Sequence, residues 1–239
     1  MARLSLVRHA QASFLSQNYD QLSALGETQA HLLGEYWAQH HVVLDRVCTG
    51  PALRHRHTAQ LVAEAYRKAN LVFPTSFIIE EFDEFPGEVV LSESLPQLLA
   101  NNPKVRDLHD AMQKAGTDAA KRATFQRLFQ AVISLWVREE IKPKNVESWQ
   151  DFCDRVNRGL SNYLANAARG ETGAIFTSGG PISVAVQRAL HLSALDTLEI
   201  AWMQRNCSFT EFLFSGSRFM LSSFNSLPHL DGEPLVTYR

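Results

Sequence analysis

The residues with the clearest chemical potential stand near the start of the chain. A short apolar segment leads directly into Arg8 and His9. A guanidinium group can bind two oxygens of a phosphoryl group, and an imidazole can attack the phosphorus as a nucleophile. The pair therefore predicts phosphoryl chemistry, although a strand can also end in Arg-His without any such role. Gln11 and Ser13, in the polar loop that follows, are candidate substrate-binding residues.

A second arginine is placed where it could meet the same group. Thr49, Gly50 and Pro51 open a predicted helix whose first turn holds Arg54. The helix dipole and the unpaired N–H groups of a first turn favour an anion. Arg54 would then complete a clamp with Arg8. The alternative is that Arg54 is an ordinary solvated charge of the helix.

An acidic run follows the third predicted strand and consists of Glu80, Glu81, Asp83 and Glu84. A carboxyl group with a raised pKa near a bound phosphate could give a leaving alkoxide its proton. The alternative is a merely acidic loop.

A glycine-rich segment, residues 177–181, stands between a predicted strand and a predicted helix. Its backbone N–H groups could bind an anion, and this makes Ser178 and Gly179 candidate substrate-binding residues. A plain strand–helix connector is the alternative.

These groups need a scaffold that brings them together. Hydrophobic patterning predicts strands over 3–8, 42–48, 77–79 and 174–177, and helices over 23–39, 52–69, 149–167 and 181–190. Residues 209–214 and 219–224 are predicted to pair as an antiparallel hairpin. The alternation of strands and helices predicts an α/β fold, a three-layer sandwich with a mostly parallel open sheet. Ligands bind beyond the carboxyl ends of such strands, where all four polar groups fall.

One long stretch breaks this alternation. Residues 85–144 contain no convincing strand, and apolar residues recur at spacings of three and four at Phe125, Leu128, Phe129, Val132 and Trp136. We expect a single domain over residues 1–239 with a helical cap insertion at about 85–144. The insertion would cover the pocket and select the leaving group.

Composition narrows the possible partners. The chain has 239 residues, of which 45% are hydrophobic and 20% charged, as is usual for a globular protein. A net charge of −2 and scattered basic residues argue against a nucleic-acid partner. No apolar run approaches the roughly 20 residues that span a bilayer. Cys48, Cys153 and Cys207 are far apart, so we expect reduced thiols in a cytoplasmic protein, with no metal and no cofactor.

Together these features resemble the histidine phosphatase superfamily, which has the phosphoglycerate-mutase-like fold, and the resemblance covers nearly the whole chain. The segment at residues 6–11 is similar to the family's Arg-His-Gly signature, and residues 22–30 to its Leu-Thr-x-x-Gly-x-x-Gln-Ala segment. Residues 53–59 are similar to its Leu-x-Arg-Ala-x-x-Thr-Ala helix start, and residues 206–211 and 224–230 to its closing hairpin. The first and third motifs, in this order and at this separation, are specific.

The resemblance implies a role for several residues. His9 would be the nucleophile that becomes phosphohistidine, and Arg8 and Arg54 would bind the phosphoryl oxygens. Glu81 would be the proton donor, with Glu84 and then Asp83 as alternates.

The chain also departs from the family pattern. The family ends its fourth strand with Ser-His-Gly, whose histidine binds phosphate, and here Ser178 stands in that histidine's place. Loss of such a contact could cost on the order of 3 kcal/mol in the transition state. Ala10 in place of glycine is a milder change. His55 and His57 either compensate for the missing histidine or are ordinary helix residues.

The sequence therefore predicts a cofactor-independent phosphomonoesterase that acts on a small phosphorylated substrate through phosphohistidine. A mutase is disfavoured because the insertion does not resemble a lid for a bisphosphate. The alternative from another class is a phosphate-pocket protein that binds a phosphorylated ligand or partner with weak or no turnover, and Ser178 favours it. A purely structural α/β protein is a third interpretation. The substrate and the oligomeric state are not predicted.

Overall fold

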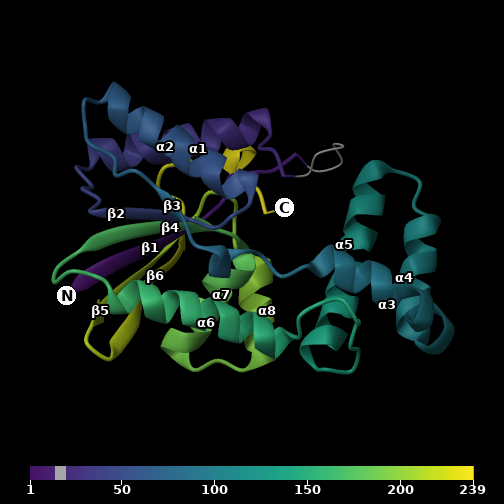
Figure 1. Ribbon diagram of the computed structural model, residues 1–239. Helices are drawn as coiled ribbons and strands as arrows, with labels where there is room; N and C mark the ends of the chain where they lie inside the picture. Colours follow the sequence, from purple (N-terminus) through teal and green to yellow (C-terminus); the bar gives the residue numbers. More distant parts are fainter. Residues whose placement is uncertain (14–19, 239) are drawn as a thin grey trace. The chain divides into compact units, whose positions relative to one another are not determined.

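The chain forms two units in a computed structural model that describes residues 1–13 and 20–238 (Figure 1). The first unit combines Met1–Glu84 with Asp154–Arg239, and the second is the continuous stretch Phe85–Cys153. Because the second interrupts the first in sequence, the chain leaves the first unit after Glu84 and returns to it at Asp154.

A sheet occupies the middle of the first unit. Its strands, in the order in which they lie side by side, are β3 (Phe77–Ile78), β2 (Arg46–Thr49), β4 (Thr172–Thr177), β1 (Ala2–Arg8), β5 (Phe209–Ser215) and β6 (Arg218–Ser226). The first four run parallel to one another, whereas β5 is antiparallel to both of its neighbours. The predicted mostly parallel open sheet and the closing hairpin are confirmed.

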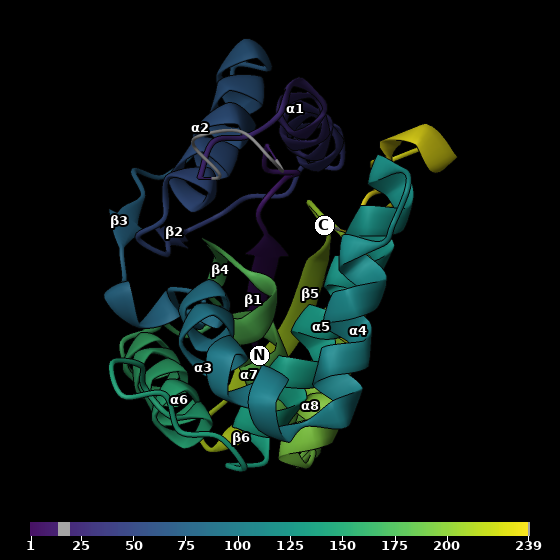
Figure 2. The ribbon, with the colours of Figure 1, turned by 90° about the vertical axis from the view of Figure 1, so that its right-hand side faces the viewer.

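Helices cover both faces of this sheet (Figure 1 and Figure 2). One face carries α1 (Ala24–Gln39) and α2 (Leu53–Lys68), and the other carries α6 (Trp149–Ala165), α7 (Gly179–Leu190) and α8 (Ala194–Met203). Ser23 caps α1, because its Oγ accepts the Gly26 N–H at 3.0 Å. In the core, the Trp37 ring meets Phe176 and Phe209 edge-on. The predicted three-layer α/β sandwich is therefore confirmed.

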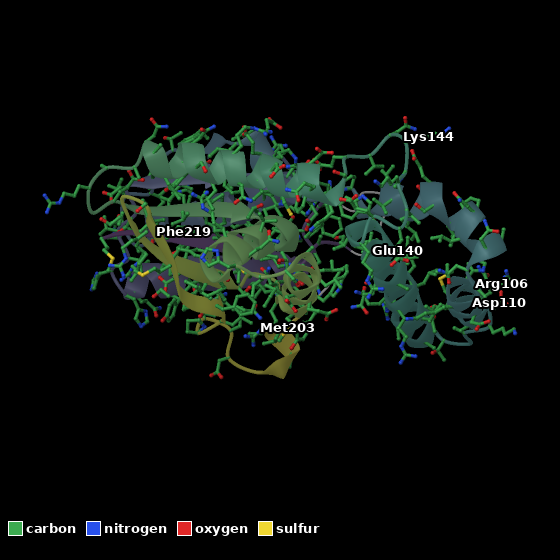
Figure 3. The ribbon with its side chains drawn as sticks, turned by 90° about the horizontal axis from the view of Figure 1, so that it is seen from below. Arg106, Asp110, Glu140, Lys144, Met203 and Phe219 are labelled. Atoms are coloured by element: carbon green, nitrogen blue, oxygen red, sulfur yellow. The ribbon has the colours of Figure 1, made fainter. Side chains whose placement is uncertain are left out.

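The second unit is helical. It contains α3 (Gly87–Asn101), α4 (Pro103–Gln113) and α5 (Asp118–Val137), followed by the first residues of α6. Its core is aromatic, with ring contacts among Phe85, Trp136, Trp149 and Phe152. Figure 3 shows Arg106 on α4, whose guanidinium donates to the backbone oxygens of Leu99 and Ala100 and so satisfies carbonyl groups at the end of α3.

The structure differs from the predicted elements at three places. The strand expected from residue 42 begins only at Arg46, and α8 was not predicted. The glycine-rich segment expected to form a tight turn over 178–181 instead contains the start of α7, with Ser178 as its N-cap residue. Proline is compatible with a helix at this point because a first turn needs no N–H partner within the helix, so the helix begins before Pro181. Among the described residues, no helix is both long and apolar enough to cross a membrane.

Candidate active site

The nucleophile predicted from sequence lies at the end of β1, beside the end of β4. Arg8 pairs with Thr177, the last residue of β4, and the His9 N–H donates to the Thr177 oxygen at 2.8 Å. The His9 ring is buried, and its Nδ1 donates to the Ala10 oxygen at 2.8 Å. Because Nδ1 carries the proton in this arrangement, the lone pair of a neutral ring is on Nε2.

The surroundings of His9 keep its ring neutral. Burial is the largest cause that holds the His9 pKa well below its usual value, and the positive charges of Arg54 and Arg8 and the nearby His55 act in the same direction. The carbonyl group of Ala10 opposes them only in part. At neutral pH the imidazole is therefore an unprotonated base, as a nucleophile must be.

Arg8 lies between His9 and the start of α7. Its side chain is buried, and its Nη1 donates to the Gln204 oxygen. A side chain on Gly179 would place its Cβ only 3.9 Å from the Arg8 Nε. Arg8 and the first residue of α7, both predicted as site residues, are thus neighbours.

Thr58 ties α2 to the loop after His9. Its Oγ1 accepts the Ala10 N–H at 3.1 Å and donates to the Arg54 oxygen at 2.7 Å. Arg54 is thereby brought to the same sheet edge, where its Nη2 donates to the Ser178 Oγ at 3.4 Å and its Nη1 forms a 2.7 Å ion pair with Asp20.

His55 also belongs to this cluster, although the sequence left its role open. The side chain is fully buried, its Nε2 lies 2.6 Å from the Ser178 Oγ, and its ring centroid is 5.7 Å from that of His9. Burial, followed by the charges of Arg54 and Arg56, holds the His55 pKa well below its usual value. A signal was available in the sequence, because His55 occupies the alanine position of the helix motif in a chain that lacks the histidine expected at Ser178.

The acidic run is attached to the end of β4 and to α7. The Thr177 Oγ1 donates to the Phe82 oxygen at 2.6 Å, and the Glu84 Oε2 accepts the Gly180 N–H at 3.3 Å. Glu81 lies in a short 3-10 turn, η1 (Glu80–Phe82), and packs against α6, where a Cβ on Gly159 would come 2.6 Å from its own Cβ. The carboxylate that meets the first turn of α7 thus belongs to Glu84, the first of the two alternates named from the sequence.

The backbone of the acidic segment is also bound by α6. Arg155 of α6 donates from Nη1 to the Glu81 oxygen at 2.9 Å and to the Asp83 oxygen at 3.2 Å. This clamp fixes the course of the acidic segment between β3 and Glu84.

Gln11 and Ser13, predicted to bind substrate, form hydrogen bonds with α1 and the segment before it. The Gln11 Oε1 accepts from the Ser23 Oγ at 2.7 Å, and the Ser13 N–H donates to the Gln21 oxygen at 2.8 Å. The Gln11 N–H also donates to the Gln29 Oε1 at 2.9 Å. These bonds hold the loop after His9 onto α1.

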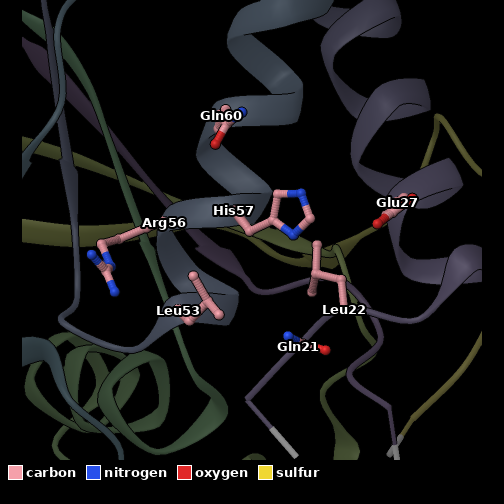
Figure 4. Close-up of a pocket in the computed structure, with 7 residues that line it drawn as sticks. All are labelled: Gln21, Leu22, Glu27, Leu53, Arg56, His57 and Gln60. Atoms are coloured by element: carbon pink, nitrogen blue, oxygen red, sulfur yellow. The ribbon is translucent and has the colours of Figure 1, made fainter. Parts of the chain in front are cut away.

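A groove lies on the opposite side of α2 from the cluster. Its lining residues on the helix, Leu53, Arg56, His57 and Gln60, repeat at three- and four-residue spacing and therefore share one face (Figure 4). Arg54, His55 and Thr58 lie on another face of the same helix. His57 consequently stands apart from His9, while His55 stands beside it.

The assembled site suits a phosphoryl group. Two guanidinium groups, a hydroxyl group and the N-terminus of α7 surround a neutral imidazole. Cationic forks and helix N-termini are the groups that proteins use to bind phosphate. Among residues 1–13 and 20–238, no three His, Cys, Asp or Glu side chains gather in a way that could hold a metal ion.

Comparison with solved structures identifies the fold. A mycobacterial glucosyl-3-phosphoglycerate phosphatase is 20% identical with a TM-score of 0.60, over 95% of this chain and 99% of that one. The α-ribazole phosphatase from Shigella flexneri is 18% identical with a TM-score of 0.61, over 94% and 96% of the two chains. A phosphoglycerate mutase from Bacillus anthracis is 14% identical with a TM-score of 0.61, over 95% and 94%.

Comparison of the sequence with curated proteins finds no match. The model of the histidine phosphatase superfamily (branch 1), in contrast, matches residues 4–80 and 114–227. These ranges include most of β1 and all of α2, β4 and the closing hairpin, and β1, α2 and β4 lead into the cluster around His9. The chain therefore belongs to the histidine phosphatase superfamily.

Proposed function

We propose that this protein hydrolyses a phosphomonoester through a phosphohistidine formed on His9. The observation that carries the proposal is the buried, neutral His9 ring, with Nδ1 donating to the Ala10 oxygen and two arginines beside it. Membership of the family and the resemblance to phosphatase structures support phosphatase-type activity. The small phosphorylated substrate, the intermediate and a cytoplasmic location are parts of the proposal.

In the first step the His9 Nε2 attacks the phosphorus. A P–N bond forms while the bond from phosphorus to the leaving oxygen breaks, and the leaving oxygen takes a proton from a carboxyl group. Arg8, Arg54 and the N-terminus of α7 neutralise the charge on the other phosphoryl oxygens. Arg54 must exchange its Asp20 partner for the phosphoryl group to do so.

We assign the carboxyl group to Glu84. It is already hydrogen-bonded to the first turn of α7, whereas Glu81 packs against α6. In the second step the Glu84 carboxylate takes a proton from water, the water oxygen bonds to phosphorus, and the P–N bond breaks. The products are inorganic phosphate and the original neutral His9.

Two alternatives make different predictions. A mutase would return the phosphoryl group to an acceptor hydroxyl, and one structural neighbour is a phosphoglycerate mutase. A phosphate-binding protein with weak turnover is favoured by Ser178, which supplies a neutral hydroxyl where the family pattern has a histidine. That the helical unit selects the leaving group stays a prediction.

The deciding experiment compares wild type with His9→Ala, using p-nitrophenyl phosphate and a panel of metabolite phosphates. Wild type should release inorganic phosphate and, when quenched in alkali during turnover, carry acid-labile phosphate on His9. The His9→Ala variant should lose both while keeping its circular dichroism spectrum. A matched control is His57→Ala, a histidine on the same helix as Arg54 but facing the groove. Substantial turnover by folded His9→Ala would refute the mechanism.

A further inference from the structure

One buried imidazole has no part in the two steps above. His55 is fully buried in the first turns of α2, with its ring centroid 5.7 Å from that of the nucleophile His9. A buried polar ring needs a hydrogen-bond partner to offset the loss of hydration. Its partner is the Ser178 hydroxyl, whose oxygen lies 2.6 Å from Nε2.

The direction of this hydrogen bond depends on which nitrogen of the His55 ring carries the proton. The His55 Nδ1 lies against Gly50, whose backbone carbonyl group opposes the lowering of the ring's pKa, but the two groups do not form a hydrogen bond of normal geometry. Nε2 has the partner with normal hydrogen-bond geometry, at 2.6 Å, so we assign the proton of the neutral ring to Nε2, from which it donates to the Ser178 Oγ. The serine's own proton is then available to another acceptor.

That acceptor would lie on the phosphoryl-binding side of the site. Ser178 is the N-cap residue of α7, and the Arg54 Nη2 also donates to its Oγ at 3.4 Å. Because the His55 and Arg54 N–H groups both donate to the serine oxygen, the hydroxyl proton points away from these two donors. An incoming phosphoryl oxygen bound by Arg54 would meet that proton.

We propose that His55 is a positioning residue that acts through Ser178, holding the serine hydroxyl so that it donates to a phosphoryl oxygen of the substrate. The proposal rests on the proposed function, because it names a further contact for the same phosphoryl group. His55 and Ser178 then act as a pair, and the loss of either side chain removes the contact with the phosphoryl oxygen.

The sequence supports the pairing independently. In the family pattern the position of Ser178 holds a histidine and the position of His55 an alanine. Here the imidazole is on α2 and the small residue is at the end of β4. Compared with the family pattern, the imidazole is supplied by α2 instead of by the residue after β4, but it lies in the same part of the site. An imidazole on residue 178 would collide with that of His55, since the two side chains are already in contact and both are fully buried.

The test is a double-mutant cycle read by two measurements. The dissociation constant for inorganic phosphate comes from calorimetry, and kcat and KM come from p-nitrophenyl phosphate. His55→Ala and Ser178→Ala should each weaken phosphate binding about tenfold, and the double variant should be no weaker than either one. His55→Gln, which can place an N–H near the same point, should recover part of the loss. His57→Ala should stay within twofold of wild type.

A second arm exchanges the residues. Ser178→His alone should lose activity, and the double variant His55→Ala with Ser178→His should regain at least tenfold over it. If His55→Ala lowers only the melting temperature and leaves phosphate binding unchanged, or if the two losses multiply, the proposal is overturned. Should His55→Ala fail to fold, His55→Gln and Ser178→Ala complete the cycle in its place.

The two hypotheses fail differently. A wild-type protein that binds phosphate without turnover contradicts the proposed function, yet the phosphate-binding cycle still tests the pair. An active wild type whose His55 variants bind phosphate normally contradicts the pair alone. A wild type that neither binds phosphate nor turns over overturns both.

Discussion

Asp20 holds Arg54 by a 2.7 Å ion pair, and the same carboxylate accepts the backbone N–H groups of Leu53 at 2.8 Å and Arg54 at 3.3 Å. The carboxylate thus occupies the first turn of α2 in the way that a bound anion would. In the proposed mechanism a substrate phosphoryl group must therefore compete with Asp20 for the Arg54 guanidinium. This competition makes Asp20 a determinant of substrate affinity.

Removing the charge of Asp20 should strengthen substrate binding. Asp20→Asn keeps an oxygen that can cap α2 but ends the ion pair, so KM for p-nitrophenyl phosphate should fall severalfold with little change in the free energy of unfolding. Asp20→Ala removes the cap as well and should in addition cost about 1 kcal/mol of stability. Steady-state kinetics and urea unfolding of both variants check this. An unchanged or higher KM in Asp20→Asn would show that Asp20 does not compete with substrate.

The proton donor can be identified by its dependence on the leaving group. Glu84→Gln should slow the hydrolysis of alkyl phosphates by about a hundredfold, within the usual range for loss of a general acid. p-Nitrophenyl phosphate should be affected much less, because its leaving group departs without a proton. Glu81→Gln is the matched control and should leave the ratio of the two rates unchanged. The reverse result would restore Glu81 as the donor, and equal losses on both substrates in Glu84→Gln would place the acid elsewhere.

The sequence predicted the sheet, the helices that cover it except α8, and the places of His9, Arg8 and Arg54 at a strand end and a helix start, because each depends on local pattern. Strand ends and helix starts are encoded by a few neighbouring residues. The start of α7 was misplaced because Gly179 and Gly180 are poor helix formers, and it is the packing around them that makes the first turn favourable.

The site contacts that were not predicted link residues far apart in the chain. Whether Glu81 or Glu84 meets α7 depends on how the acidic segment turns after β3, which the Thr177 and Arg155 hydrogen bonds to its backbone decide. The pairing of His55 with Ser178 likewise spans 123 positions. No periodicity encodes such a contact, although two reciprocal departures from one family pattern could have indicated it.

Buried histidines should make the stability depend on pH. Burial lowers the His229 pKa to about 4, and it holds those of His9 and His55 well below the usual value. The unfolded chain takes up protons on these residues below about pH 6.5, while the folded chain does not, so stability falls as pH falls. Between pH 7 and pH 5, His229 alone should account for about 2 kcal/mol.

The variant His229→Phe isolates this contribution. The ring would keep its place beside Phe209 and Tyr36 but could not titrate. The difference in the free energy of unfolding between pH 7 and pH 5, measured with urea, should shrink by about 2 kcal/mol. Any packing cost of the larger ring affects both pH values and cancels. The same difference in wild type and variant would mean that His229 is protonated equally in both states.

Replacing Gly50 even by alanine should lower both stability and activity, because two parts of the candidate site lie against it. A Cβ on Gly50 would come 2.5 Å from the His55 Nδ1 and 2.6 Å from the Phe82 oxygen, the acceptor of the Thr177 hydroxyl. Both neighbours are held by hydrogen bonds of 2.6 Å on their other sides, so neither can move without loosening the Ser178 hydroxyl or the segment that carries Glu84.

Gly50→Ala should therefore cost about 1 to 3 kcal/mol of stability, as overpacking of a core does, and lower kcat/KM by more than tenfold at a temperature where the variant stays folded. Gly116→Ala is the matched control, since nothing lies within 4 Å of its added Cβ, and it should leave activity unchanged and stability the same or slightly higher. Urea unfolding and kinetics with p-nitrophenyl phosphate measure the two effects separately. A Gly50→Ala variant that loses stability but keeps full kcat/KM would mean that the site accommodates the methyl group without moving His55 or Glu84, and that their positions are less tightly coupled than these contacts indicate.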